Sequence, residues 1–276
     1  MDLKPSKACI YDVHCHIHEA PEELSVLSAK QNPTTQIVFC IQATKYTDWN
    51  DVIQLKQRYS DRVIPALGLH PWFVERLLTG EIPETWAEEL RELLALHGGI
   101  LGECGLDKAA RSPKTHKLYP IEAQIHILKT QIGIAHELNI PISLHCVRAF
   151  GVLAEILSEV EEKQILPPRI MLHSYSGSPD MLKQIFLKGK LGERVYVSFS
   201  SLVNGRNREK SIKCIRAVPE QRLLIESDLH NASAAVLAIE EAADLVAEAR
   251  GWSLDEAHTV LTRNSYEFFG NSNCLL

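Results

Sequence analysis

The sequence lacks several features that would assign it to a simple class of protein. None of its seven cysteines stands in a C-x-x-C pair and their number is odd, so free thiols in a reducing compartment are indicated. No apolar stretch approaches the roughly 18 residues of a membrane-spanning helix. The glycine-rich motif that binds nucleotide phosphates is missing after the first strand-like segment, which argues against a doubly wound nucleotide-binding sheet.

The sequence also lacks an excess of basic residues. Its 29 Lys and Arg residues are outnumbered by 35 Asp and Glu residues, which gives a formal net charge of −6. Proteins that coat nucleic acid depend on a strongly basic surface, so this class is excluded, whereas a basic cleft on an acidic body is not. The first residues do not form the apolar run of a secretory signal. We therefore expect an intracellular protein of the cytoplasm or the nucleus that is neither secreted nor bound to a membrane.

Short apolar runs rich in β-branched residues recur along the whole chain, at intervals of about 25 to 40 residues. Continuous apolar runs, unlike alternating ones, are typical of parallel strands that are buried on both faces. Eight such runs predict strands at Cys9–His14, Ile37–Ala43, Val63–Leu69, Gly99–Glu103, Ile140–His145, Arg169–His173, Val195–Phe199 and Arg222–Glu226.

The segments between these runs carry helical patterns. Apolar residues repeat every three or four positions over Ile121–Ala135, and the alanine-rich segment Ala232–Arg250 is followed by Gly251. Ser253–Glu256 has the pattern of a capping box that opens a last helix. Eight strand–helix repeats with right-handed crossovers form either a closed barrel or a doubly wound sheet, and this chain length is typical of the barrel. We therefore expect a TIM-like (β/α)8 barrel that forms a single domain over residues 1–276.

Imidazoles and carboxylates stand at the ends of six predicted strands. Because the carboxyl ends of barrel strands meet on one rim, these side chains are expected to converge. His14 and His16 lie two apart on a strand, so both point to the same side, as two ligands of one metal ion require. Glu103 and Asp228 end apolar strands, where a buried carboxylate costs several kcal/mol unless a cation or hydrogen bonds compensate it. The full set predicts a metal centre made of His14, His16, Glu103, His145, His173 and Asp228.

Six motifs in chain order carry a resemblance to a known family. They are DVHCH at 12–16, GLHP at 68–71, GECGLD at 102–107, the strand at 141–145, HSYSG at 173–177 and ESD at 226–228. With these motifs the chain resembles the TatD family of metal-dependent hydrolases, within the amidohydrolase-like barrels. The segment Asn264–Gly270 is also similar to the last helix of the family, so the resemblance spans nearly the whole chain.

The resemblance implies two divalent metal ions, for which the mixed imidazole and carboxylate ligands suit Mg, Mn or Zn. One ion would be held by His14, His16, Glu103 and Asp228, and the other by the bridging Glu103 together with His145 and His173. Two ions about 3.5–4 Å apart clamp phosphoryl oxygens and lower the pKa of a water. Glu103 and Asp228 are thus the predicted catalytic residues, with Asp228 as the base that accepts the proton of that water.

Two further residues are predicted to bind the substrate. The resemblance places His70 beside the metal ions, where it would contact the substrate phosphate. Arg148 would be a second contact, but the family carries its arginine one residue earlier, where this chain has Val147. A shift by one residue at a strand end turns a side chain in another direction.

Several residues next to the family motifs are expected to lie at the surface or have two possible roles. The chain has Leu229 and His230 where the family has a small residue and a proline, and a surface role is favoured for His230. His18 and Glu19 follow the two metal-ligand histidines and are expected to be exposed. A basic loop could guide a phosphodiester toward the rim or simply be solvated; its cations are Lys108, Arg111, Lys114 and Lys117.

The favoured function is a two-metal phosphodiesterase that acts on the ends of nucleic acids, most simply a DNase of the 3′-exonuclease kind. Two alternatives stay open, because a fold does not fix a function. One is hydrolysis of an ester or amide, such as an aminoacyl ester on tRNA or a small cyclic amide. The other is a metal-binding barrel without catalysis that serves as a surface for a protein partner. The sequence does not identify such a partner.

Overall fold

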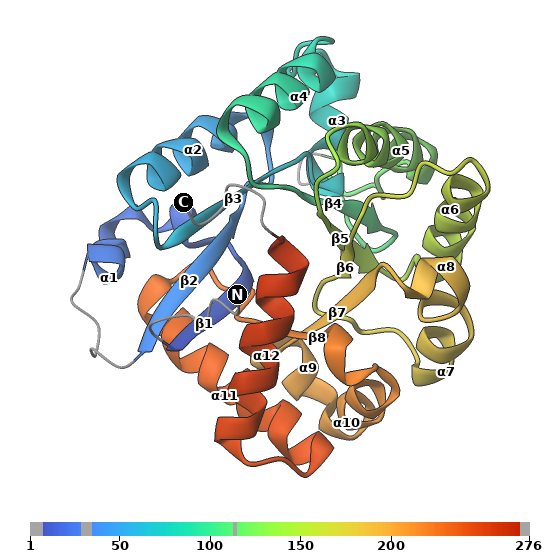
Figure 1. Ribbon diagram of the computed structural model, residues 1–276. Coiled ribbons are helices and arrows are strands. Elements are labelled where there is room, and N and C mark those ends of the chain that lie inside the picture. Colours follow the sequence, from blue (N-terminus) through green and yellow to red (C-terminus); the bar gives the residue numbers. More distant parts are fainter. Residues whose placement is uncertain (1–7, 29–34, 113–114, 271–276) are drawn as a thin grey trace.

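Eight parallel strands, neighbours in space in the same order as in the chain, form one sheet at the centre of the molecule (Figure 1). The computed structural model describes residues 8–28, 35–112 and 115–270, so Lys114 of the basic loop and the last of the seven cysteines, Cys274, lie outside the described residues. The strands are β1 (Ala8–Cys15), β2 (Thr35–Gln42), β3 (Val63–Leu67), β4 (Ile100–Asp107), β5 (Ile142–Val147), β6 (Ile170–Leu172), β7 (Val195–Ser200) and β8 (Leu223–Glu226).

The sheet curls into a nearly closed barrel. The backbone N–H of Asp228 donates to the carbonyl oxygen of His14 at 3.0 Å, and the N–H of His16 donates to the carbonyl oxygen of Leu229 at 2.8 Å. These bonds join the carboxyl ends of β1 and β8. The predicted barrel is thereby confirmed, and its eight strands lie where the apolar runs indicated.

Helices surround the barrel (Figure 1). They are α1 (Ser25–Ser28), α2 (Trp49–Arg58), α3 (Val74–Leu78), α4 (Trp86–His97), α5 (Ile121–Glu137), α6 (Phe150–Glu162), α7 (Pro179–Met181), α8 (Gly189–Gly192), α9 (Ser201–Asn204), α10 (Arg208–Ala217), α11 (Ala232–Arg250) and α12 (Leu254–Phe269). The predicted ends of the last two are confirmed: Gly251 is left-handed with φ 71° after α11, and Ser253 Oγ accepts from the Glu256 N–H at the start of α12. No described helix has the length and apolar character needed to cross a bilayer.

The core has two parts. The larger part lies between the barrel and its helices, whereas a smaller cluster fills the barrel interior with inward side chains such as Val13, Ile64 and Met171. Phe268 and Phe269 at the end of α12 pack against this interior cluster, and in Figure 1 the red helix α12 lies across that end of the barrel. One end of the barrel is thus closed by aromatic rings, which leaves the opposite rim for polar side chains.

Strand β4 runs four residues beyond its predicted end and carries Glu103 in its middle. Two glycines make this possible, since β4 lies very close to its neighbours. A Cβ on Gly102 would lie 2.5 Å from Gln42 Oε1, and one on Gly105 would lie 2.0 Å from the carbonyl oxygen of His145. The GECG motif therefore lets Glu103 approach the β5 histidine.

Candidate metal centre

The six predicted metal ligands come together at the carboxyl ends of five strands. His14 and His16 lie at the end of β1, Glu103 lies in β4 and His145 in β5, while the other two follow β6 and β8 as His173 and Asp228. All six side chains are largely buried, the most exposed being Asp228 at 18%. The convergence that the strand-end pattern predicted is therefore present in the folded chain.

The carboxylate of Glu103 lies at the centre of this group and presents a different oxygen to each half. Oε2 faces β1: it lies 3.4 Å from His16 Nε2 and 3.5 Å from His14 Nε2. Asp228 Oδ1 completes this side, at 3.6 Å from His16 Nε2 and 3.9 Å from His14 Nε2. We call these residues the β1 side of the centre.

The other oxygen of Glu103 faces a second set of imidazoles. Oε1 lies 2.8 Å from His145 Nδ1, 2.9 Å from His173 Nε2 and 3.4 Å from His70 Nε2. We call this set the β5 side of the centre. Its first two distances are those of charge-assisted hydrogen bonds. The side chains are therefore packed more closely here than on the β1 side.

Residues behind the centre fix the orientation of three imidazoles. His16 Nδ1 lies 3.0 Å from the carbonyl oxygen of Gln42, and His173 Nδ1 lies 3.3 Å from Glu226 Oε1. Both partners can only accept, so each Nδ1 carries a proton and Nε2 is the atom that faces the centre, where it can bind a metal once its own proton is lost. His14 Nδ1 lies 3.0 Å from Ser143 Oγ, which can play either part. Such outer hydrogen bonds are what metal-binding histidines require.

The β1 side fits a divalent cation. His14 Nε2 is fully buried and has no hydrogen-bond partner within the described part of the chain. An unpaired buried polar atom costs free energy, and a cation would satisfy it. Ligand atoms about 2.0–2.2 Å from one ion at tetrahedral angles lie about 3.3–3.6 Å apart, close to the 3.4–3.9 Å found between His14, His16, Glu103 and Asp228.

The electrostatics of the group favour ionised carboxylates. Burial alone raises the pKa of Glu103, but the imidazoles of His70, His173 and His14 outweigh it and hold that pKa well below its usual value. Burial lowers the pKa of His14, so this imidazole is neutral and available as a ligand. For His16, burial is outweighed by the hydrogen bond to Asp228 and the charge of Glu103, which raise its pKa to about 9.

Asp228 reaches the centre through an unusual backbone conformation. It stands just after β8 with a positive φ of 57°, a region that costs most residues free energy but that Asp tolerates better. Although burial raises its pKa, the hydrogen bond to His16 and the nearby imidazoles outweigh this and lower the pKa to about 2. Asp228 is therefore a carboxylate at neutral pH.

His70 lies beside the centre but differs from the other imidazoles in its hydrogen bonds. Its Nδ1 accepts from the backbone N–H of Trp72 at 3.2 Å, so the proton of the neutral ring sits on Nε2. Burial lowers its pKa to about 4 in spite of Glu103, so the ring is neutral. The N–H on Nε2 points toward Glu103, so in this tautomer the atom is a donor and not a metal ligand.

Arg148 is the predicted site residue that the fold does not bring into the group. It follows the last residue of β5, has a left-handed backbone with φ 53° and is exposed. No hydrogen bond or ion pair joins its guanidinium to any residue in the described ranges. Arg148 thus stands exposed, one residue past the position of the family arginine, and its contact with the substrate stays a prediction.

The basic loop after β4 folds back on itself. Arg111 forms an isolated antiparallel bridge with Leu118, and its guanidinium donates to the carbonyl oxygen of His116 at 2.9 Å. Lys108, Arg111 and Lys117 are exposed. The structure therefore leaves their role in guiding a substrate as a prediction.

The expected exposure of His18 is wrong. Its imidazole is only 3% exposed and its Nε2 lies 3.5 Å from Asp48 Oδ2, because the chain turns back toward α2 directly after β1. Glu19 is exposed, as expected, and it pairs with Nδ1 of His230 at 2.7 Å. His230 is 60% exposed, which agrees with a surface position, yet its ring stacks on His16 with centroids 5.3 Å apart.

Several residues around the centre received no role from the sequence. Asp12 is fully buried and accepts two hydrogen bonds from Ser227, one from the backbone N–H of Ser227 at 3.0 Å and one from its hydroxyl at 2.6 Å. Glu226 accepts from Ser198 Oγ at 2.5 Å and faces His173. The signal for both was present, since each is a carboxylate within an apolar strand segment, but only the fold shows which partner each has.

The chain is similar to proteins of one family over nearly its whole length. A sequence profile described as TatD related DNase matches residues 11–270. The Cut9-interacting protein scn1 of Schizosaccharomyces pombe is 28% identical, with 94% of this chain and 98% of that protein covered. The human Deoxyribonuclease TATDN3 is 25% identical, with 97% of each covered.

A solved structure supports the same fold. The TatD homologue YjjV of Escherichia coli superposes with a TM-score of 0.73 and 24% sequence identity, over 94% of this chain and 97% of that one. This likeness concerns the arrangement of the barrel. The profile match over residues 11–270 carries the assignment: the chain belongs to the family of TatD-related DNases, the hydrolases that its strand-end motifs resemble.

Proposed function

We propose that this hydrolase cleaves phosphodiester bonds at the ends of DNA strands, in the manner of a 3′-exonuclease, with two divalent metal ions. One observation carries the proposal: Glu103 presents one oxygen to His14 and His16 and the other to His145 and His173. A single buried carboxylate between two sets of imidazoles is the arrangement that a pair of bridged cations needs.

The first ion would be held on the β1 side by His14, His16, Glu103 and Asp228. The second would be held on the β5 side by His145, His173 and the other oxygen of Glu103. Imidazole and carboxylate ligands suit Mg, Mn or Zn. When bound, such ions would lower the pKa of a nearby water and neutralise charge on the phosphate.

Asp228 is the proposed base that accepts the proton of the attacking water. Its carboxylate is ionised and is the ligand with the largest solvent exposure, 18%, so water can reach it. Ser174 Oγ donates to its Oδ2 at 3.4 Å, while Oδ1 faces His14 and His16. The two oxygens therefore have separate surroundings, one toward the ligands and one toward the rim.

His70 is the proposed donor to the substrate. Its Nδ1 is occupied by the Trp72 N–H, so Nε2–H can donate a hydrogen bond to a phosphate oxygen next to Glu103. Arg148 is exposed on the same rim, and its guanidinium would contact a longer strand and not the phosphate at the centre. Hydrogen-bond donors that are already held in place in a buried site usually stabilise the charge that develops in the transition state.

The experiment is an activity screen with and without metal. Protein treated with EDTA and then supplied with Mg, Mn or Zn is offered single-stranded DNA, an aminoacyl ester and a dihydropyrimidine-like amide. We expect release of nucleotides from DNA only when metal is restored. Turnover of the ester or the amide in place of DNA would contradict the proposal, and so would turnover that persists in EDTA.

We also propose that the protein works inside the cell. Cys15, Cys104, Cys146 and Cys214 are free thiols, and free thiols persist in reducing compartments such as the cytoplasm and the nucleus. Fractionation of cells that make the tagged protein would test this, and recovery from the medium would contradict it.

A further inference from the structure

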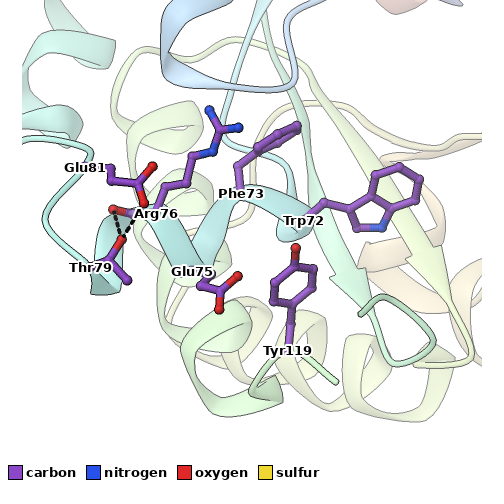
Figure 2. Close-up of a pocket in the computed structure, with 7 residues that line it drawn as sticks. All are labelled: Trp72, Phe73, Glu75, Arg76, Thr79, Glu81 and Tyr119. Carbon is purple, nitrogen blue, oxygen red and sulfur yellow. Dashed lines mark hydrogen bonds between the residues drawn. The ribbon is translucent and has the colours of Figure 1, made fainter. Parts of the chain in front are cut away.

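A small cavity lies beside the metal centre on the rim of the barrel. Its volume is about 160 Å³, and its walls include Trp72, Phe73, Glu75, Arg76 and Tyr119. Figure 2 shows the ring of Tyr119 between the side chains of Glu75 and Trp72, with its hydroxyl pointing toward the turn that carries Trp72 and Phe73. Sites for drug-sized ligands have volumes of roughly 300–1,000 Å³, so this cavity accepts only a small group such as one planar ring system.

Trp72 connects this cavity to the centre. Its indole ring meets the ring of His70 edge to face, with centroids 5.1 Å apart. Its Nε1–H donates to Asp107 Oδ2 at 2.7 Å, and the same carboxylate oxygen lies 3.5 Å from His145 Nε2. A group that rests on Trp72 is therefore next to a phosphate held by His70.

The lining of the cavity favours an uncharged aromatic ligand. Trp72 is 51% exposed although its N–H is anchored, so a broad apolar surface is held in place at the rim. Glu75 and Glu81 contribute two carboxylates against the single guanidinium of Arg76, and this balance disfavours a phosphate in the cavity. A carboxylate can instead accept hydrogen bonds from the N–H groups of a nucleobase.

We propose that this cavity is a nucleobase subsite, in which the base next to the cleaved phosphate stacks on Trp72 near Tyr119. The proposal rests on the proposed action on DNA. Stacking on an aromatic ring is tolerant of sequence, because every base has a π-face. The subsite would thus favour substrates that carry a base without selecting one base.

The first test measures binding without turnover. Titration with dAMP should quench the fluorescence of Trp72, which is 51% exposed, whereas Trp49 and Trp86 are buried and Trp252 is partly buried. Deoxyribose 5-phosphate, which has the phosphate but no base, should quench it little, and W72F should lose most of the dAMP signal. Equal responses to dAMP and deoxyribose 5-phosphate would overturn the subsite.

The second test compares two oligonucleotides that differ only in their last two residues, which carry bases in one and baseless tetrahydrofuran spacers in the other. W72A should lower kcat/KM on the base-bearing strand about five- to 150-fold, the range that stacking of a base on an aromatic ring gives. Its loss on the baseless strand should be at least five times smaller. W72F should lose less than W72A, because it keeps a ring.

The control is L78A, which removes another exposed apolar side chain, from α3 and outside the cavity. An equal loss by W72A on both strands would overturn the subsite and leave Trp72 as a positioning residue for Asp107 and His145. If the unaltered protein cleaves neither strand, the proposed DNA cleavage is overturned, and the dAMP titration still decides whether the base-binding cavity exists.

Discussion

The two sides of Glu103 contain similar ligands but differ in how closely they are packed. On the β1 side the nearest atoms are 3.4–3.9 Å apart, and His14 Nε2 has no hydrogen-bond partner in the described residues. On the β5 side Glu103 Oε1 lies 2.8 Å from His145 and 2.9 Å from His173. On the β1 side the atoms already lie near the spacing of ligands around one ion, whereas on the β5 side a cation must separate Glu103 Oε1 from two imidazoles.

This difference has a structural origin. The β1 side is fixed by backbone bonds between β1 and β8 and by the buried pair of Asp12 and Ser227. The imidazoles of the β5 side also contact each other, since His145 Nδ1 lies 3.2 Å from His173 Nε2. A preorganised site binds more tightly, because less of its binding free energy is spent on rearrangement. We therefore expect the β1 side to be the site of higher affinity.

The largest effect is expected from Glu103→Gln, because Glu103 belongs to both sides. The amide keeps the shape but removes the charge that both ions share, so turnover should fall at least a thousandfold, corresponding to several kcal/mol of transition-state stabilisation. Bound metal, measured by elemental analysis, should fall on both sides. Glu84→Gln, at an exposed position, is the control. A variant that retains more than about a tenth of the rate would show that Glu103 does not bridge.

Asp228→Asn should have the next largest effect. The amide cannot accept the proton of the water, and loss of a general base lowers rates about 10²- to 10⁴-fold. We expect at least a hundredfold lower turnover even at saturating metal, together with weaker binding on the β1 side. Should excess metal restore full activity, Asp228 would be a ligand only, and another group would have to accept the proton.

Metal titration of His14→Ala and His145→Ala tests the comparison directly. The unaltered protein should bind close to two ions in two steps by calorimetry. His14→Ala should lose the tighter step and His145→Ala the weaker one. His126→Ala, an exposed histidine of α5, should keep both steps. Loss of the tighter step in His145→Ala would reverse the proposed order of the two sides.

His70→Ala should separate substrate binding from metal binding. His70 Nε2 carries a proton and is not a ligand in the proposed scheme, so both ions should remain. Turnover should fall about 10- to 100-fold, as expected when one hydrogen-bond donor to the transition state is lost. A parallel loss of bound metal would make His70 a third imidazole ligand on the β5 side.

The smallest effect is expected from Ser227→Ala, which weakens the contact between Asp12 and Ser227 behind the β1 side. The variant loses the hydroxyl that donates to Asp12, and a buried acceptor without its partner costs about 1–3 kcal/mol. Urea unfolding should show a free energy of unfolding lower by that amount. Ser158→Ala, on the exposed face of α6, should change it by less than about 0.5 kcal/mol. Equal free energies of unfolding for the two variants would contradict a structural role for the contact between Asp12 and Ser227.

The sequence by itself determined the barrel and the members of the centre. Apolar runs separated by helical segments favour the barrel at this length over a doubly wound sheet, and parallel strands carry their carboxyl ends to one rim whatever the details of packing. For this reason His14, Glu103 and Asp228 were predicted together although they are far apart in the chain. Ser253 and Gly251 marked helix ends correctly, because caps are local interactions.

Only the tertiary structure decided which partner each buried group has. Arg148 is exposed on a left-handed backbone after β5, and the burial of His18 depends on Asp48, which directly precedes α2. The anchoring of Trp72 by Asp107 joins the turns after β3 and β4. The nearest imidazole nitrogens likewise lie 3.4–3.5 Å from Glu103 on the β1 side but 2.8–2.9 Å from it on the β5 side. Spacing along a chain cannot encode such differences, because they arise from the packing of elements that are distant in sequence.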